Sequence, residues 1–381
     1  MLKSITLKEY TTFIKETTFD FSATNYKILE NTNVGSNRIL KGALFVGENA
    51  SGKTQVLQAI VQLLDMLIEN SEQNYLLKKS LYTKGAKYSL KYVFDILGNE
   101  IKYEVEFDGY SIINEKLLLN NEVKIERINN SGNTYFGEKK TVNDINLNLS
   151  FIKNEYYNTR FNNNTILNEW FLYLKNSLYV NCLLGTIKSY NPLKVSEQIL
   201  KKYAEENNAN KLNELLKNIG YNSEVIIDKK TSNEDKSVVF KSEKEAVFMK
   251  KIGTDVPMPL SIESTGNQAL MNIILPINYA IQNNCMLIID EFSSGLHNEL
   301  EETLIKYFFN NSKDSQLFFT THSTNVIDTE LLRPDQIYSF RFDSKKGTLI
   351  KRFSDENPRE SQNMEKMYLN GVFDGMPKYN K

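Results

Sequence analysis

The feature that most constrains the fold is the stretch Gly-Glu-Asn-Ala-Ser-Gly-Lys-Thr at residues 47–54, which fits the pattern G-x-x-x-x-G-K-[ST]. A short apolar run at residues 42–46 precedes it, and apolar residues at helical spacing follow it over residues 55–64. In this pattern the glycines let backbone N–H groups surround a phosphate, and the following helix directs its positive end at the anion. Strand, loop and helix in this order predict a phosphate-binding loop in an α/β fold.

The residue types within the loop define its expected chemistry. Lys53 would contact the β- and γ-phosphates of a nucleotide and assist catalysis there, and the hydroxyl group of Thr54 would bind Mg²⁺. The nucleotide-binding residues that we predict are Gly47, Glu48, Asn49, Ala50, Ser51, Gly52, Lys53, Thr54 and Gln55.

A second apolar run, residues 285–289, ends in the two carboxylates Asp290 and Glu291. An Asp-Glu pair at the end of a buried parallel strand is the expected partner of a phosphate-binding loop. Asp290 would then hold Mg²⁺, and Glu291 would orient and deprotonate the attacking water. Alone, this pair more often marks a strand that runs into a polar turn. Together with residues 47–54 it predicts a hydrolytic nucleotide site.

Two further segments carry candidate phosphate contacts. Ser264-Thr265-Gly266 opens a helical pattern, and a Ser-x-Gly turn at a helix start is an anion-binding arrangement. The chain has two histidines, His297 and His322, and His322 follows the apolar strand pattern of residues 316–321. At the end of a core strand beside a nucleotide site, we predict that His322 contacts the γ-phosphate. For His297 a catalytic role and a mere subunit contact are left open.

The remaining pattern suggests inserted lobes. Residues 4–22 alternate as a hairpin would, and residues 88–127 resemble a β-meander with Asp108-Gly109 as one turn. Residues 165–218 carry apolar residues at helical spacing, and two short strands are expected at 224–227 and 238–240.

Composition excludes several classes of protein. The net charge of −1 gives no overall basic field for nucleic acid, although a local basic patch is not excluded. The two cysteines, Cys182 and Cys285, lie far apart and indicate neither a disulfide framework nor a zinc site. The start lacks a signal-peptide pattern, and no apolar run approaches the roughly 18 residues of a membrane span. We therefore expect a cytoplasmic protein without membrane contact.

The order of these motifs resembles the ATPase heads of the ABC/SMC superfamily. In such heads Ser264 and Gly266 match the signature motif, which contacts ATP bound to the opposite subunit. The turn 293–297 matches the D-loop, and His322 matches the switch histidine. The signature departs from Leu-Ser-Gly-Gly-Gln, because this chain reads Glu-Ser-Thr-Gly-Asn. No Q-loop glutamine can be assigned.

Four shorter segments are similar to the AAA-type, ABC-like ATPases of bacterial abortive-infection operons, which belong to anti-phage defence and toxin–antitoxin systems. They are residues 19–22, 38–42, 113–117 and 365–377. The tail could equally be a helix packed on the core or a docking element for an effector. The resemblance implies a P-loop NTPase of ABC/SMC-head type, an α/β fold with a mixed sheet core, an antiparallel β-lobe and an inserted helical lobe. We expect one head over 1–381, with a nucleotide-binding core at 1–80 and 256–381, the β-lobe at 81–160 and the inserted lobe at 161–255.

The resemblance also implies function. The expected protein binds and hydrolyses ATP with Mg²⁺ and forms a homodimer with ATP at the interface, or a higher oligomer. The residues after His322 are too few for a fused nuclease, so a Toprim-type or other effector nuclease would come from a neighbouring gene. DNA or a phage protein would be the trigger. The alternative is an SMC-like DNA-repair or recombination ATPase that binds DNA directly, which the neutral charge and the lack of a coiled-coil pattern disfavour.

Overall fold

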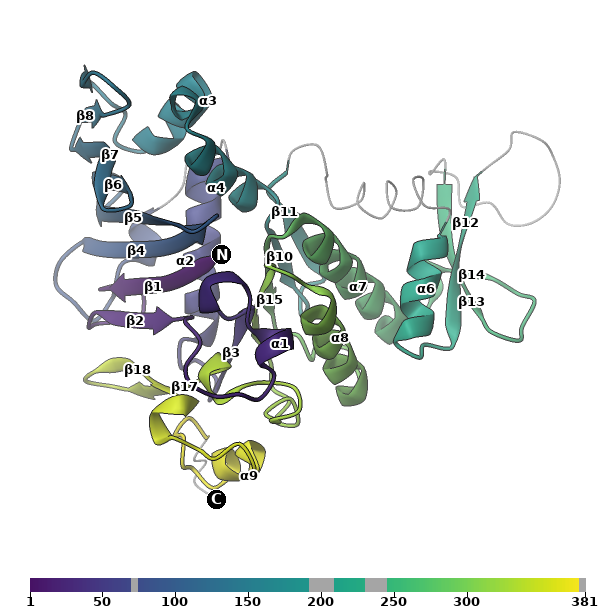
Figure 1. Ribbon diagram of the computed structural model, residues 1–381. Helices are drawn as coiled ribbons and strands as arrows, with labels where there is room; N and C mark the ends of the chain where they lie inside the picture. Colours follow the sequence, from purple (N-terminus) through teal and green to yellow (C-terminus); the bar gives the residue numbers. More distant parts are fainter. Residues whose placement is uncertain (70–74, 192–208, 230–244, 377–381) are drawn as a thin grey trace.

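The described part of the chain forms two large sheets, a third, smaller one and the helices that pack on them (Figure 1). The structure, a computed structural model, describes residues 1–69, 75–191, 209–229 and 245–376. The first sheet is antiparallel and has the strand order β2-β1-β4-β5-β6-β7-β8-β9. Its strands are β1 (Leu2–Lys8), β2 (Thr17–Asp20), β4 (Lys87–Ile96), β5 (Asn99–Asp108), β6 (Ser111–Leu119), β7 (Glu122–Ile128), β8 (Ser131–Thr134) and β9 (Lys140–Val142).

The second sheet carries the phosphate-binding loop and has the order β11-β10-β15-β16-β3-β17-β18. Its five central strands are parallel, and an antiparallel strand lies at each edge. The strands are β3 (Gly42–Gly47), β10 (Leu178–Asn181), β11 (Thr186–Ser189), β15 (Met286–Asp290), β16 (Gln316–Thr320), β17 (Ile337–Asp343) and β18 (Gly347–Arg352).

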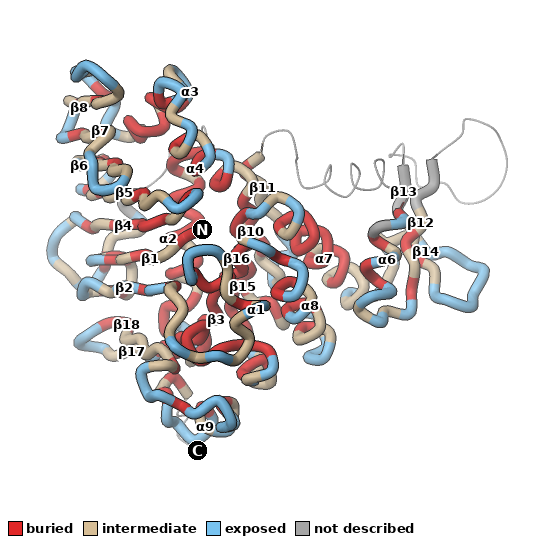
Figure 2. The backbone as a smooth tube through the Cα atoms, viewed as in Figure 1, coloured by how far each residue is buried: buried red, intermediate tan, exposed pale blue. Residues whose placement is uncertain are grey.

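Alternation along β3 shows why this sheet is buried on both faces. Ala43 and Phe45 pack into one hydrophobic cluster, whereas Leu44 and Val46 pack into another. Side chains of successive residues point to opposite faces of a sheet, so a strand covered on both faces must be apolar throughout. The continuous apolar runs in β3 and β15 follow from this position, and Figure 2 shows the buried residues concentrated along these central strands.

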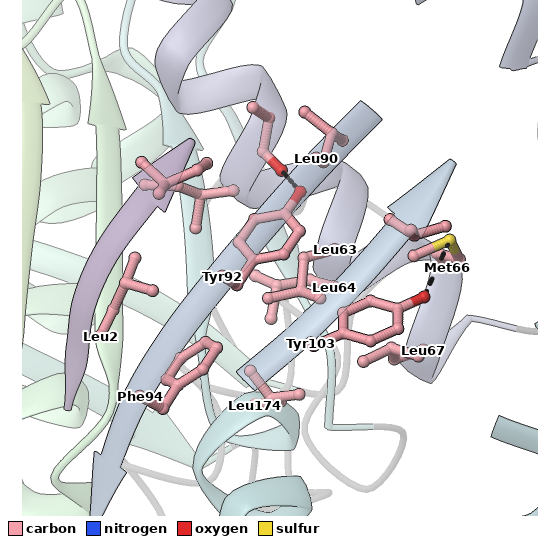
Figure 3. Packing of buried hydrophobic residues seen from close by; sticks show 14 of the residues in the cluster. Leu2, Leu63, Leu64, Met66, Leu67, Leu90, Tyr92, Phe94, Tyr103 and Leu174 are labelled. Carbon is pink, nitrogen blue, oxygen red and sulfur yellow. Dashed lines mark hydrogen bonds between the residues drawn. The ribbon is translucent and has the colours of Figure 1, made fainter. Parts of the chain in front are cut away.

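Helix α2 (Lys53–Ile68) packs against both large sheets and begins directly after the phosphate-binding loop. Leu63, Leu64 and Leu67 face aromatic side chains of the antiparallel sheet, and the Tyr92 hydroxyl donates to Ala59 O at 2.6 Å (Figure 3). The opposite face of the parallel sheet is covered by α7 and α8. The other α-helices within the described residues are α1 (Glu30–Asn33), α3 (Phe151–Asn163), α4 (Thr165–Lys175), α6 (Asn210–Asn218), α7 (Thr265–Asn283), α8 (Asn298–Asn311) and α9 (Met364–Leu369). Among the described residues, no helix has the length and apolar character needed to cross a membrane.

The third sheet, β12-β13-β14, projects beyond α7 and α8 together with α6 (Figure 1). Its strands are β12 (Ser223–Lys229), β13 (Glu245–Lys251) and β14 (Met258–Pro259), and the predicted strand at 238–240 lies outside the described residues. The short helix η3 (Leu260–Ile262) connects this sheet to the start of α7. The other short 3₁₀ helices are η1 (Ser36–Arg38), η2 (Tyr75–Lys78), η4 (Pro334–Gln336) and η5 (Phe353–Glu356).

The sheets cross the lobe boundaries expected from the sequence. Strands β1 and β2 join the antiparallel sheet of the β-lobe, although they precede the phosphate-binding loop. The helical pattern predicted for residues 165–218 is interrupted by β10 and β11, and β10 pairs with β15 in the nucleotide-binding sheet. In the described part of the tail, Phe373 stacks on Phe353 with ring centroids 3.8 Å apart, so this part packs on the core.

Candidate active site

Two glycines allow the phosphate-binding loop to follow its path. Gly47 and Gly52 have φ angles of +145° and +106°, which lie in the region that favours glycine. A Cβ on Gly47 would meet Phe340 O at 2.3 Å, and one on Gly52 would meet Thr348 Oγ1 at 2.6 Å. The loop is therefore held tightly against β17 and β18, and neither glycine can be replaced without moving the backbone.

Lys53 is buried inside this loop, and its Nζ donates to Gly47 O and Glu48 O, both at 2.8 Å. Burial lowers the pKa of Lys53, while the nearby carboxylates of Glu291, Asp290 and Glu48 oppose that shift. A buried cation whose hydrogen bonds within the described residues go to neutral carbonyl oxygens is suited to take up an anion such as a phosphate.

The other loop residues surround Lys53. The buried hydroxyl of Ser51 has no hydrogen-bond partner within the described ranges, which leaves it available to a ligand.

Asn49 and Ala50 are exposed at the tip of the loop, where Ala50 has a φ of +60°. Glu48 Oε1 accepts from Phe342 N at 3.0 Å, and Gln55 N donates to Gly52 O at 3.1 Å at the start of α2.

Thr54 and Asp290 meet although they lie far apart in the sequence. Thr54 Oγ1 donates to Asp290 Oδ1 at 3.1 Å, and Thr320 Oγ1 donates to the same oxygen at 2.7 Å. Mg²⁺ prefers oxygen ligands and takes few of them from the protein when a phosphate is present. A hydroxyl and a carboxylate at the end of the phosphate-binding loop fit this requirement. Within the described residues no cluster of three or more His, Cys, Asp or Glu side chains could hold a metal alone.

Glu291 follows Asp290 in a strained conformation. Its φ of +58° is unusual for a residue other than glycine, and its N–H donates to Thr320 Oγ1 at 2.8 Å. Glu291 Oε2 lies 2.9 Å from His322 Nε2. Because backbone strain of this kind persists only when surrounding contacts enforce it, Thr320 and His322 fix the direction of the Glu291 side chain.

His322 comes from the segment after β16, beside the turn after β15. Its backbone N–H donates to Ser293 Oγ at 3.4 Å, and its side chain is 51% exposed. The structure therefore brings Lys53, Thr54, Asp290, Glu291 and His322 to one edge of the parallel sheet, where the strands β3, β15 and β16 end.

Ser264 and Gly266 lie elsewhere on the surface of the subunit. Ser264 is the exposed N-cap of α7, and its hydroxyl accepts from Asn267 N at 3.3 Å. A Cβ on Gly266 would come no closer than 3.5 Å to Gly295 O, so the fold itself does not require glycine there. Across the described ranges no hydrogen bond joins Ser264 or Gly266 to residues 47–54.

The structure also places two residues here that the sequence prediction missed. Thr320 holds both members of the acidic pair, and its only sequence signal was the Thr-Thr-His end of the strand. Asn181 lies beside Asp290 in the parallel register of β10 and β15. Its side chain accepts from Leu184 N at 2.9 Å and donates to the Tyr179 hydroxyl at 3.3 Å. An amide thus occupies the sheet edge next to the Asp290 carboxylate.

Comparisons with known proteins agree with this architecture. The family model described as "AAA domain, putative AbiEii toxin, Type IV TA system" matches residues 43–328, more than half of the 381-residue chain. No curated protein matches the chain significantly.

Many solved structures match this chain, and two of them are similar over most of their length. The SMC head domain from Thermotoga maritima is 16% identical, with a TM-score of 0.49 over 92% of this chain and 97% of that one. An SmcHead bound to the C-winged helix domain of ScpA is 12% identical, with a TM-score of 0.54 over 92% and 97% of the two chains. The second likeness supports an SMC-head fold with a mixed parallel sheet and an antiparallel lobe. Since the family match spans most of the chain and includes the phosphate-binding loop, the protein belongs to this AAA family, as an ATP-binding, P-loop ATPase domain.

Proposed function

We propose that the protein is an ATP-hydrolysing switch whose two subunits close around ATP. The observation that carries this proposal is the assembly of a buried lysine, a hydroxyl–carboxylate pair and a constrained glutamate at one sheet edge. Lys53 would bind the β- and γ-phosphates together with the N–H groups of the loop. Thr54 and Asp290 would hold Mg²⁺, which supplies positive charge against the phosphate oxygens when bound.

Glu291 is the proposed general base. It would orient the attacking water and accept its proton, while Lys53 stabilises negative charge on the transferred phosphoryl group. His322 would contact the γ-phosphate and hold the Glu291 carboxylate, to which it is already bonded at 2.9 Å. Removing a general base typically costs about 10²–10⁴-fold in rate.

A second copy would complete the site. Ser264 and Gly266 are exposed or half-buried and lie beside the turn at Gly295, but they make no hydrogen bond to the phosphate-binding loop of their own subunit in the described structure. If they bind the γ-phosphate on a partner's Lys53, then two symmetric sites form in a two-fold dimer. ATP would favour the closed dimer, and hydrolysis would reopen it.

The family description supports a role in a toxin–antitoxin or anti-phage defence system. We propose that closure and opening restrain or release a separate effector, such as a Toprim-type or other nuclease from a neighbouring gene, in response to DNA or a phage protein. The similar SMC head in complex with a winged-helix domain supports a protein partner of this kind. An SMC-like DNA-repair ATPase is the alternative, which the SMC-head fold favours and the net charge of −1 disfavours.

ATPase measurements test the proposal. Glu291→Gln should abolish turnover but retain ATP, whereas Lys53→Ala should lose both. An unaltered rate in Glu291→Gln would refute the assigned base. Salt-dependent DNA binding by the protein alone would favour the repair function, and toxicity only together with a neighbouring gene product would favour defence.

A further inference from the structure

A buried carboxyl group lies behind the segment that carries His322. Glu301 is in the first turn of α8 and has no exposed surface. In the part of the chain that the structure describes, neither of its carboxylate oxygens has a hydrogen-bond partner. Glu301 also shares the apolar face of α8, with Leu304, Ile305 and Phe308 at the helical spacings that follow it.

Such a residue is costly for folding. A buried carboxyl group without a hydrogen bond loses its hydration and gains little in return, so an apolar residue of similar size would pack more favourably. Accordingly, burial raises the pKa of Glu301, although the hydroxyls of Thr321 and Ser323 oppose the shift. The first turn of a helix favours a negative charge but offsets only part of this cost.

The neighbours of Glu301 point to its role, because Thr321 and Ser323 flank His322. Ser323 Oγ now donates to Asn298 Oδ1 at 3.2 Å, and Ser323 N donates to Thr321 Oγ1 at 3.1 Å. The hydroxyls of Thr321 and Ser323 lie near enough to Glu301 to act on its pKa, so they are the donors closest to a carboxyl group that makes no well-formed hydrogen bond. Two other titratable groups interact with this carboxyl: Glu302 raises the pKa of Glu301, and Glu301 helps to raise the pKa of the Cys182 thiol.

We propose that Glu301 is a positioning residue that receives hydrogen bonds from Thr321 and Ser323 when His322 moves onto the γ-phosphate of bound ATP. The inference rests on the proposed ATPase function. Before ATP binds, the carboxyl group has no hydrogen-bond partner and the segment is held by Asn298. Once the segment moves, Glu301 gains its hydrogen bonds and holds His322 in the catalytic arrangement. The segment thus has two arrangements, and Glu301 favours the active one.

Three variants of the full-length protein test this role. Glu301→Leu removes the acceptor and should raise the denaturation midpoint, yet lower kcat about tenfold or more, as expected for a lost hydrogen bond to a charged group. Glu301→Gln retains an acceptor oxygen and should recover part of kcat. Glu299→Gln, on the same helix turn but exposed, is the matched control and should match the wild type. ATP affinity should stay within about twofold in all three, since Lys53 is untouched.

A double-mutant cycle with Thr321→Val identifies the route. If Glu301 acts through Thr321, the combined loss of kcat is smaller than the product of the single losses. If the double variant instead loses kcat by the full product of the two single losses, Glu301 does not act through Thr321. A wild-type kcat in both Glu301→Leu and Glu301→Gln, with Glu291→Gln inactive, would overturn the inference and leave the ATPase function standing. Wild-type turnover in Glu291→Gln would instead overturn both. If Glu301→Leu does not fold, Glu301→Met, which also lacks an acceptor oxygen, decides the matter by the same comparison of kcat.

Discussion

Replacing Thr320 with valine should damage both the fold and the reaction. The fully buried Thr320 hydroxyl donates to Asp290 Oδ1 at 2.7 Å and accepts from Glu291 N at 2.8 Å. Valine has the same shape as threonine but can neither donate nor accept a hydrogen bond. The change therefore leaves the backbone N–H of Glu291 without its partner and Asp290 Oδ1 with the bond from Thr54 alone, while the apolar packing of β16 is kept.

The magnitude follows from these two groups. Leaving the Glu291 N–H unsatisfied costs about 1–3 kcal/mol, and losing one of the two bonds to Asp290 Oδ1 costs about 1 kcal/mol more, so the free energy of unfolding should fall by about 2–4 kcal/mol. Glu291 also sits at a φ of +58°, and the left-handed region costs roughly 1–2 kcal/mol for such a residue. Without the acceptor that Thr320 Oγ1 offers to its N–H, Glu291 can relax and move its carboxylate. Since a displacement of about 1 Å in a catalytic group can cost 10²-fold, kcat should fall by about that factor.

Urea denaturation and steady-state ATP hydrolysis measure the two effects. Thr320→Ser is the control, because it keeps the hydroxyl and loses only a methyl group. We expect the serine variant to retain most of kcat. If Thr320→Val hydrolyses ATP at the wild-type rate, or if the serine variant is equally impaired, the assigned hydrogen bonds do not position the base.

Three other predictions concern binding, assembly and pH. Gly52→Ala should lose ATP binding in calorimetry, because a Cβ would lie 2.6 Å from Thr348 Oγ1 and the φ is +106°; wild-type affinity would contradict the loop geometry. Gly266→Asp should keep the wild-type thermal midpoint, because the site has room and a helix start favours an acidic residue, but it should abolish ATPase activity by repelling a partner's γ-phosphate. The raised pKa of Glu301 means that the folded state binds a proton more tightly, so stability falls as the pH rises from the ordinary glutamate pKa through the raised one. In denaturation curves collected across the pH range, Glu301→Gln should not show this fall in stability. If the wild type and Glu301→Gln depend on pH in the same way, the raised pKa of Glu301 is refuted.

The local parts of the site were predictable from the sequence. The phosphate-binding loop is a continuous segment whose glycines, lysine and threonine each have a defined chemistry. The strand that ends in Asp290 and Glu291 is likewise an uninterrupted apolar run, as expected for a strand buried on both faces.

The parts that depend on contacts between distant segments were not predictable. β10 is only a short apolar stretch within a helix-like pattern, and periodicity cannot separate such a stretch from a buried helix segment. Its pairing with β15 is what places Asn181 beside Asp290. Thr320 bonds Asp290 because β16 lies next to β15, a relation that no local pattern encodes. Glu301 did leave a signal, an acidic residue on an apolar helix face, but its closeness to the His322 segment emerges only in three dimensions.

The central claim is that ATP on Lys53 is covered by Ser264 and Gly266 of a second copy. Light scattering on the Glu291→Gln protein tests it most directly, since that variant should bind ATP without consuming it. Without nucleotide the mass should be that of one 44.0 kDa chain. With ATP and Mg²⁺ it should double, and adding Gly266→Asp should return it to the monomer. A mass that stays monomeric while ATP is bound, or a dimer that survives Gly266→Asp, would contradict the account.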